Sequence, residues 1–310
     1  MIRSTVVICL VLAGLPACTT TSTTEQSPAP TIAELKGATY TGIDGQTTAV
    51  TLHDGRWAGK PAVAGGASGP LVELAGDLRV TGDLDGDGQP EAVAVLAFST
   101  GGSGVRSYLV VVTRDAGKLR NTATTLLGDR VQIRSVQIND RKIVVSAVRA
   151  GAGDPACCGG ELVEWQWTPG KDQSNALVSK ITGRLSLDTL SGTVWVLQAW
   201  NLGEPAASTP AVTLKLESGH LAGASGCNRY SAEVQGTATP GELSVGLIAG
   251  TRMACPERES AVETRFLEQL GGARKFGFLL GRLAITYMRA DGALGTMLFD
   301  GGTAPSTSAR

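Results

Sequence analysis

Histidine is scarce in this chain, with only His53 and His220 among 310 residues. A serine–histidine–aspartate triad would have to use one of the two, and both lie in turn-like contexts beside glycine-containing pairs. The chain also lacks a G-x-S-x-G nucleophile motif, a P-loop and an H-E-x-x-H zinc motif. These absences predict that the protein is not an enzyme.

Charge is also low, because charged residues make up 18% of the chain and the formal net charge is -1. Basic residues with interleaved aromatics form no stripe, which excludes nucleic acid as an expected partner. Beyond the N-terminus, no apolar run approaches the roughly 20 residues of a membrane-spanning helix. Glycine is abundant instead, with 41 residues, and this favours a loop-rich β protein over a helical bundle.

The N-terminus has the pattern of an export signal. Arg3 precedes an uncharged, mostly apolar run at residues 6–15. At about 1.5 Å per residue this run is too short to cross a hydrocarbon core of roughly 30 Å. The following L-P-A-C at 15–18 resembles a lipoprotein signal peptidase site. We therefore expect residues 1–17 to be removed and Cys18 to carry a diacylglyceryl group, with an ordinary secretory signal as the alternative.

The next segment, residues 18–32, is expected to be a flexible tether. It is rich in threonine, serine and proline and too polar to pack. Thr19 follows the lipidated cysteine where aspartate would retain the protein at the inner membrane, by resemblance to the Gram-negative sorting rule. The sequence therefore predicts a lipid-anchored envelope protein, with the outer membrane favoured and the exported part facing the periplasm. Its expected partners are the membrane and an envelope protein of unidentified type.

The rest of the chain, about 280 residues, is long enough for two domains. We expect a mainly β or α+β fold, with a β-rich domain at 33–168, a linker at 169–189, a β-sheet domain with one packed helix at 190–302, and a disordered tail at 303–310. Runs of β-branched and aromatic residues predict the strands. The expected strands are 47–52, 91–98, 108–113, 131–138, 142–148 and 162–167 in the first domain, and 194–199, 211–216, 243–248, 283–287 and 296–299 in the second.

The expected helix covers residues 256–270. It begins with proline, has two glutamates near its start and is followed by two glycines. Val262, Phe266 and Leu270 lie four residues apart, which places them on one apolar face.

Acidic residues at alternate positions indicate a metal-binding loop in the first domain. Asp83, Asp85, Asp87, Gln89 and Glu91 offer hard oxygen ligands, the kind that calcium prefers. The glutamate of an EF-hand's twelfth position is missing, and the pattern resembles the D-x-D-G-D-G loops of FG-GAP-like β-repeat proteins. We expect calcium with a structural role. Metal-free Asp-Gly turns are the alternative.

Six cysteines are present, of which one is removed with the signal and Cys18 accepts lipid. Four remain, an even number that suits an oxidising compartment. Cys227 and Cys255 are expected to pair. Cys157 and Cys158 are adjacent and could form a vicinal disulfide, while zinc is disfavoured because no histidine lies at ligand spacing from them.

The second half of the chain resembles the META domain, also called the HslJ-like heat-shock domain. The resemblance rests on T-V-W-V-L at 193–197, G-C-N-R-Y at 226–230, T-R-M-A-C-P at 251–256, the helix with Phe266-Leu267, and the closing L-F at 298–299. It covers roughly residues 190–299. It implies a compact mixed β domain with a helix, in envelope proteins linked to stress tolerance and with no established catalytic activity.

The two longest motifs leave two interpretations open. Asn228, Arg229, Tyr230, Thr251 and Arg252 either stabilise the local fold or form an exposed recognition patch. The leading hypothesis is a non-enzymatic, stress-related envelope lipoprotein that acts as a binding or structural module. The alternatives are a calcium-dependent extracytoplasmic hydrolase that uses the aspartate loop, and an inhibitor of extracellular proteases.

Overall fold

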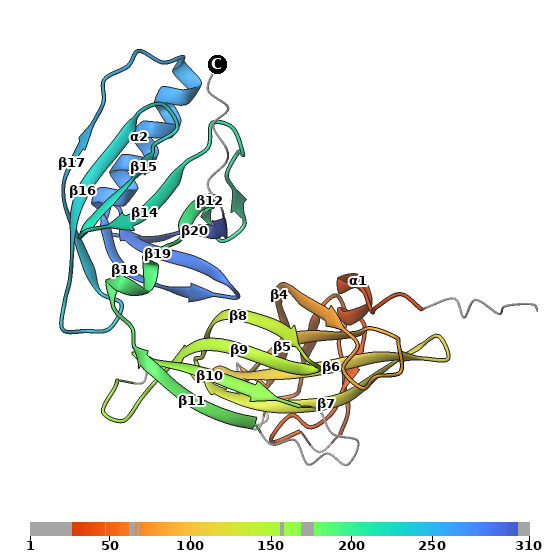
Figure 1. The fold of residues 1–310 in the computed structure, drawn as a ribbon. Coiled ribbons are helices and arrows are strands. Elements are labelled where there is room, and N and C mark those ends of the chain that lie inside the picture. The colour runs from red at the N-terminus through yellow and green to blue at the C-terminus, as the bar shows by residue number, and fades with distance from the viewer. Residues whose placement is uncertain are drawn as a thin grey trace, which may run out of the picture.

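The computed structural model describes residues 27–46, 48–61, 66, 68–155, 158–168 and 177–302. The described residues form two β-rich parts, coloured red to green and green to blue along the chain (Figure 1). The mainly β fold predicted from the sequence is confirmed, and α2 is the one helix in the described ranges that is longer than a single turn. The expected signal peptide, Cys18 and the tail at 303–310 lie outside the described residues.

The first part contains a sandwich of two antiparallel sheets. A five-stranded sheet has the order β3-β4-β5-β6-β7, and a four-stranded sheet has the order β11-β10-β9-β8. A short helix and a two-stranded sheet, β1-β2, cover the other face of the larger sheet. The elements are α1 (Ile32–Leu35), β1 (Thr39–Tyr40), β2 (Val50–Thr51), β3 (Arg56–Ala58), β4 (Leu71–Gly82), β5 (Glu91–Ser99), β6 (Arg106–Asp115), β7 (Lys118–Asp129), β8 (Gln132–Asn139), β9 (Lys142–Arg149), β10 (Glu161–Trp167) and β11 (Leu177–Arg184).

The apolar run of β5 is explained by burial on both faces of its sheet. Successive side chains of a strand point to opposite faces. Ala94 and Leu96 therefore pack under α1 and the β1-β2 pair, while Val93 and Val95 pack against the four-stranded sheet. A strand covered on both sides has a continuous hydrophobic sequence, which is why this strand was predictable.

The second part is one strongly curved antiparallel sheet with a helix. Its order is β17-β16-β15-β14-β12-β20-β19-β18, and β13 pairs with β12. A bridge between Glu242 and Lys275 brings the first and last strands of this order together. The elements are η1 (Leu187–Leu190), β12 (Val194–Asn201), β13 (Glu204–Pro205), β14 (Thr213–Glu217), β15 (His220–Ala224), β16 (Arg229–Gly236), β17 (Leu243–Gly250), α2 (Glu257–Gly271), β18 (Ala273–Leu279), β19 (Arg282–Met288) and β20 (Leu294–Gly302).

Helix α2 packs its apolar face onto this sheet, as the four-residue spacing predicted. Phe266 and Leu270 are fully buried, and Val262 is partly buried against the same core. The ring of Tyr230 meets Phe266 edge-on, with centroids 5.2 Å apart. The helix therefore fixes the positions of side chains on its opposite face.

The expected linker at 169–189 contains a strand. Residues 177–184 form β11, which pairs along its length with β10. The strand has eight residues, and five successive ones are exposed. It therefore lacks the alternation of apolar and polar residues that is typical of a strand with one buried face. It is held by backbone pairing at the edge of the sheet, which the side-chain pattern does not report.

The two parts contact each other through β18 and the start of β8. Gln132 Oε1 accepts a hydrogen bond from the backbone nitrogen of Phe278 at 2.9 Å. The Arg134 guanidinium stacks 4.9 Å from the centroid of the Phe278 ring. Within the ranges described above, no helix is long and apolar enough to span a membrane.

Candidate functional site

The aspartate loop, residues 83–91, connects β4 to β5. Three of its five predicted ligands lie close together. One oxygen each from Asp83, Asp85 and Glu91 lies within 4.8 Å of the others. With calcium–oxygen distances of about 2.3–2.6 Å, oxygens at this separation can share one ion. Asp87 and Gln89 belong to the same loop, and the Asp87 carboxylate lies outside this cluster. The spacing and the donor type both fit calcium.

Backbone amides hold the aspartates of this loop in place. Asp83 accepts hydrogen bonds from the nitrogens of Gly86 at 2.6 Å and Gly88 at 3.1 Å. Asp87 Oδ1 accepts the nitrogen of Gln89 at 2.7 Å. Gly86 and Gly88 both have φ of 85°, a conformation that glycine adopts without strain. The sequence D-G-D-G therefore fixes the curl that gathers the carboxylates.

Glu91 closes the cluster from inside the sandwich. It is only 4% exposed, and its Oε2 accepts the backbone nitrogen of Leu84 at 2.7 Å. Burial raises the pKa of this carboxyl group, and the nearby charges of Asp85, Asp87 and Asp83 raise it further. A cation bound in the loop would offset this repulsion among the acids.

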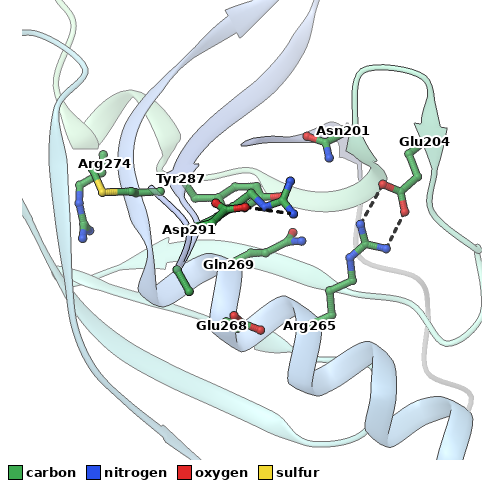
Figure 2. Close-up of a pocket in the computed structure, with 11 residues that line it drawn as sticks. Asn201, Glu204, Arg265, Glu268, Gln269, Arg274, Tyr287 and Asp291 are labelled. Atoms are coloured by element: carbon green, nitrogen blue, oxygen red, sulfur yellow. Dashed lines mark hydrogen bonds and ion pairs between the residues drawn. The ribbon is translucent and has the colours of Figure 1, made fainter. Parts of the chain in front are cut away.

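A separate cavity of about 680 Å³ lies on the second part of the molecule (Figure 2). It is bounded by the β12–β13 hairpin, the C-terminal half of α2, the start of β18 and the end of β19. Its lining residues are Asn201, Glu204, Arg265, Glu268, Gln269, Arg274, Tyr287, Met288, Arg289, Ala290 and Asp291. They come from β12, β13, α2, β18, β19 and the turn after β19. They form no motif along the chain, so the sequence does not predict this cavity.

One wall of this cavity is an ordered ion pair. Arg265 donates to both carboxylate oxygens of Glu204, at 2.6 and 2.9 Å. Its guanidinium also lies 4.5 Å from the centroid of the Trp200 ring. Hydrogen bonding from Arg265 lowers the pKa of Glu204, so this carboxylate stays ionised at neutral pH.

Asn228 forms the centre of a third cluster, between β15, the loop after β17 and α2. Its Oδ1 accepts the Thr251 hydroxyl at 2.7 Å and the backbone nitrogen of Met253 at 2.8 Å. Its Nδ2 donates to Glu263 Oε2 at 3.0 Å. The buried hydroxyl of Ser225 donates to the other oxygen of Glu263 at 2.6 Å. One asparagine thus joins three segments that are distant in sequence.

The remaining residues of the expected recognition patch lie on different sides of the backbone. Tyr230 is buried, its hydroxyl donates to the carbonyl of Thr213, and burial raises its pKa. Arg229, Thr251 and Arg252 are exposed. The structure therefore brings the two motifs together, with Asn228 and Tyr230 directed inward and the two arginines on the surface.

The cysteines next to these motifs are bonded. Cys227 and Cys255 form a disulfide that joins the β15–β16 turn to the start of α2, with Cα atoms 6.0 Å apart. The pairing expected from the sequence is confirmed. In the first part, Cys158 takes part in a disulfide and lies 3.4 Å from Lys275 Nζ. Cys157, its expected partner, lies outside the described residues.

Residues 188–297 match the family model of the META domain. The match begins at η1 and ends within β20, so it contains the whole curved sheet up to its closing strand. It confirms the resemblance that the two motifs carried. No curated protein and no solved structure matches the chain.

The META domain contains both the Asn228 cluster and the cavity. The Asn228 cluster is built largely from the family motifs G-C-N-R-Y and T-R-M-A-C-P. These motifs contain Asn228, Thr251, Met253 and both cysteines of the disulfide. They supply none of the residues that line the cavity. The motif residues therefore organise the domain, while the cavity is a separate surface feature of this chain.

Proposed function

We propose that the protein is a non-enzymatic envelope lipoprotein, held on the membrane by lipid at Cys18, that acts as a binding or structural module under stress. The observation that carries the proposal is the META match over residues 188–297, since this domain resembles modules of envelope proteins linked to stress tolerance. The lipoprotein signal at residues 15–18 and the polar tether after it support an anchored location. The lack of catalytic motifs supports a role without catalysis.

The anchor and the stress role are tested together in cells that lack the native chain. Wild type, Cys18→Ala and the control Thr20→Ala are expressed, the envelope is fractionated, and survival after heat shock is counted. Wild type and Thr20→Ala are expected to appear in the membrane fraction and to restore survival. Cys18→Ala is expected in the soluble periplasm with reduced survival, because a lipid chain supplies the membrane affinity.

Equal partitioning of wild type and Cys18→Ala would refute the anchor. Equal survival with and without the protein would refute the stress role. A third variant, Thr19→Asp, tests the destination, since it is expected to move the protein from the outer to the inner membrane.

We also propose that the aspartate loop binds calcium in a structural role, through Asp83, Asp85 and Glu91 with Asp87 and Gln89 beside them. The convergence of three carboxylates within 4.8 Å supports this. Bound calcium would link β4 to β5 at the loop and neutralise the acids there. Extracytoplasmic calcium modules commonly bind with dissociation constants of about 10⁻⁴ to 10⁻³ M.

Calcium at about 10 mM is therefore expected to stabilise the protein by about 1.4 to 2.7 kcal/mol, seen as a rise in melting temperature. Asp85→Asn should abolish the rise because it removes one charged ligand. Asp54→Asn, in another exposed Asp-Gly turn, serves as the matched control and should keep it. The calcium proposal fails if wild type shows neither heat in isothermal titration nor a change in melting temperature.

A further inference from the structure

A second cavity, with a volume of about 720 Å³, lies where the first part of the chain meets the META domain (Figure 1). One side of this interdomain cleft is formed by residues 76–79 of β4. The other side comes from the β12–β13 hairpin, the β18–β19 hairpin and Leu298 of β20. Pockets for small ligands have volumes of about 300–1,000 Å³ and occur preferentially at domain interfaces. The cleft therefore has the size and the location of a ligand site.

A close contact between β4 and the β18–β19 turn holds the two sides of the cleft in place. The pairing of β4 with β5 is interrupted at residues 75–78, where β4 bulges toward the META domain. Gly76 has φ of 59°, and a Cβ atom there would lie 2.8 Å from Leu280 Cδ1, so glycine permits the approach. Leu280 packs against the core of the first part, and the Gly281 nitrogen donates to the carbonyl of Ile133 at 2.9 Å.

The lining of the cleft is rich in leucine. Five leucines contribute to it, together with one alanine and one proline: Leu78, Leu202, Leu279, Leu280 and Leu298. Leu202 is 70% exposed and Leu279 is 41% exposed, although both are large and apolar. Covering such surface removes it from water, which is favourable. The cleft therefore presents apolar surface that a ligand can cover.

The charged groups of the described lining already have partners. The four contacts join Arg79 to the carbonyl of Pro30 at 2.9 Å, Arg282 to Asp300 at 3.0 Å, Asp77 to Lys36 at 3.5 Å and Glu204 to Arg265 at 2.6 Å. Gln198 is the one uncharged polar side chain among these lining residues. A bound peptide would bury backbone N–H groups that each need an acceptor, and few side-chain acceptors are left for them. An acyl chain needs none.

The cleft also lies close to the start of the described chain. Arg79 lines it and binds the carbonyl of Pro30, so Pro30 lies at its edge. Pro30 is twelve positions after Cys18, and a chain of this length spans at most about 40 Å when fully extended. With lipid at Cys18, the edge of the cleft therefore stays within about this distance of the membrane surface, where acyl chains are available.

We propose that the interdomain cleft binds the acyl chain of a single-chain lipid, such as a fatty acid released from the membrane. The leucines supply the contact surface for the chain. Each methylene group that moves from water into the cleft should tighten binding about fourfold. The inference rests on the proposed role as a membrane-anchored binding module and gives that role a ligand class.

The test is isothermal titration of the full exported chain carrying Cys18→Ala, which needs no detergent that would compete for the cleft. The probes are octanoate and dodecanoate, which share a carboxylate and differ in chain length. Dodecanoate is expected to bind with a dissociation constant of about 1 mM or tighter, and octanoate at least about tenfold more weakly. A contact made through the carboxylate alone would give equal affinities.

The matched variants replace exposed leucines inside and outside the cleft. Leu202→Ser should weaken dodecanoate binding about fivefold, and the double variant with Leu279→Ser about tenfold or more. Leu294 is 66% exposed and does not line the cleft, so Leu294→Ser should bind as the parent chain does. Equal melting temperatures show that the variants are folded.

Three results would overturn the inference: no binding of dodecanoate up to about 5 mM, equal affinity for the two probes, or equal affinity in the parent chain and the Leu202/Leu279 double variant. A second copy of the chain in the cleft would instead appear as concentration-dependent dimerisation that Leu202→Ser abolishes, and this would also overturn it. Because every titration uses chains without Cys18, failure here leaves the anchor and the stress role intact. Dodecanoate binding without any effect of Cys18 in cells would remove only the proposed function.

Discussion

Replacing Asn228 by alanine is expected to lower the free energy of opening of the META domain by about 3 kcal/mol. The side chain is 6% exposed and joins Thr251, Met253 and Glu263. Alanine leaves the Met253 nitrogen and one oxygen of Glu263 without these partners. Asn228 makes three of these hydrogen bonds, one of them to the glutamate carboxylate. A neutral hydrogen bond contributes about 0.5–1.5 kcal/mol to stability, and one to a charged group about 1.5–3 kcal/mol.

The measurement is hydrogen exchange followed by mass spectrometry, which reports on the META domain separately from the sandwich. Protection of β16 and β17 should fall in Asn228→Ala. Gln235→Ala removes an exposed amide from the same strand and should change protection by less than about 0.5 kcal/mol. A similarly small change in Asn228→Ala would show that the cluster does not stabilise the domain.

Several of the strands that were predicted correctly have mostly buried side chains. The β5, β6 and β9 runs are rich in valine and other apolar residues because sheets or helices cover them. Strand β4 was missed, since its second half is largely exposed and its pairing with β5 shifts between Leu74 and Arg79. Strand β7 was missed for a similar reason, because most of its residues are polar or partly exposed.

The sequence identifies the motif residues, but it does not predict which residues they contact. Asn228 and Glu263 are separated by 35 positions. Their contact depends on α2 folding back onto the sheet, which no local pattern reports. Residues of the cavity are spread from Asn201 to Asp291 and meet only through strand pairing and the placement of that helix. The sequence therefore predicts many of the elements and the Cys227–Cys255 disulfide, while sites that join several elements require the structure.

Removing the disulfide is expected to lower the stability of the META domain by about 3 to 4 kcal/mol. Cys227 and Cys255 are 28 positions apart, and joining them reduces the conformational entropy of the unfolded chain. The double variant Cys227→Ser/Cys255→Ser is preferred to a reducing agent, because Cys158 is also in a disulfide. Hydrogen exchange of α2 and β17 measures the loss, and protection equal to that of wild type would contradict the prediction.

The disulfide and Asn228 should not act independently. Asn228 follows Cys227 directly, and its partners Thr251 and Met253 lie just before Cys255. The disulfide therefore holds the two ends of the same hydrogen-bonded segment. In a double-mutant cycle, the loss from Asn228→Ala is expected to be smaller by about 1 kcal/mol once both cysteines are replaced, because part of the cluster has already loosened. Additive losses would mean that the disulfide acts through the unfolded chain alone and does not position the asparagine.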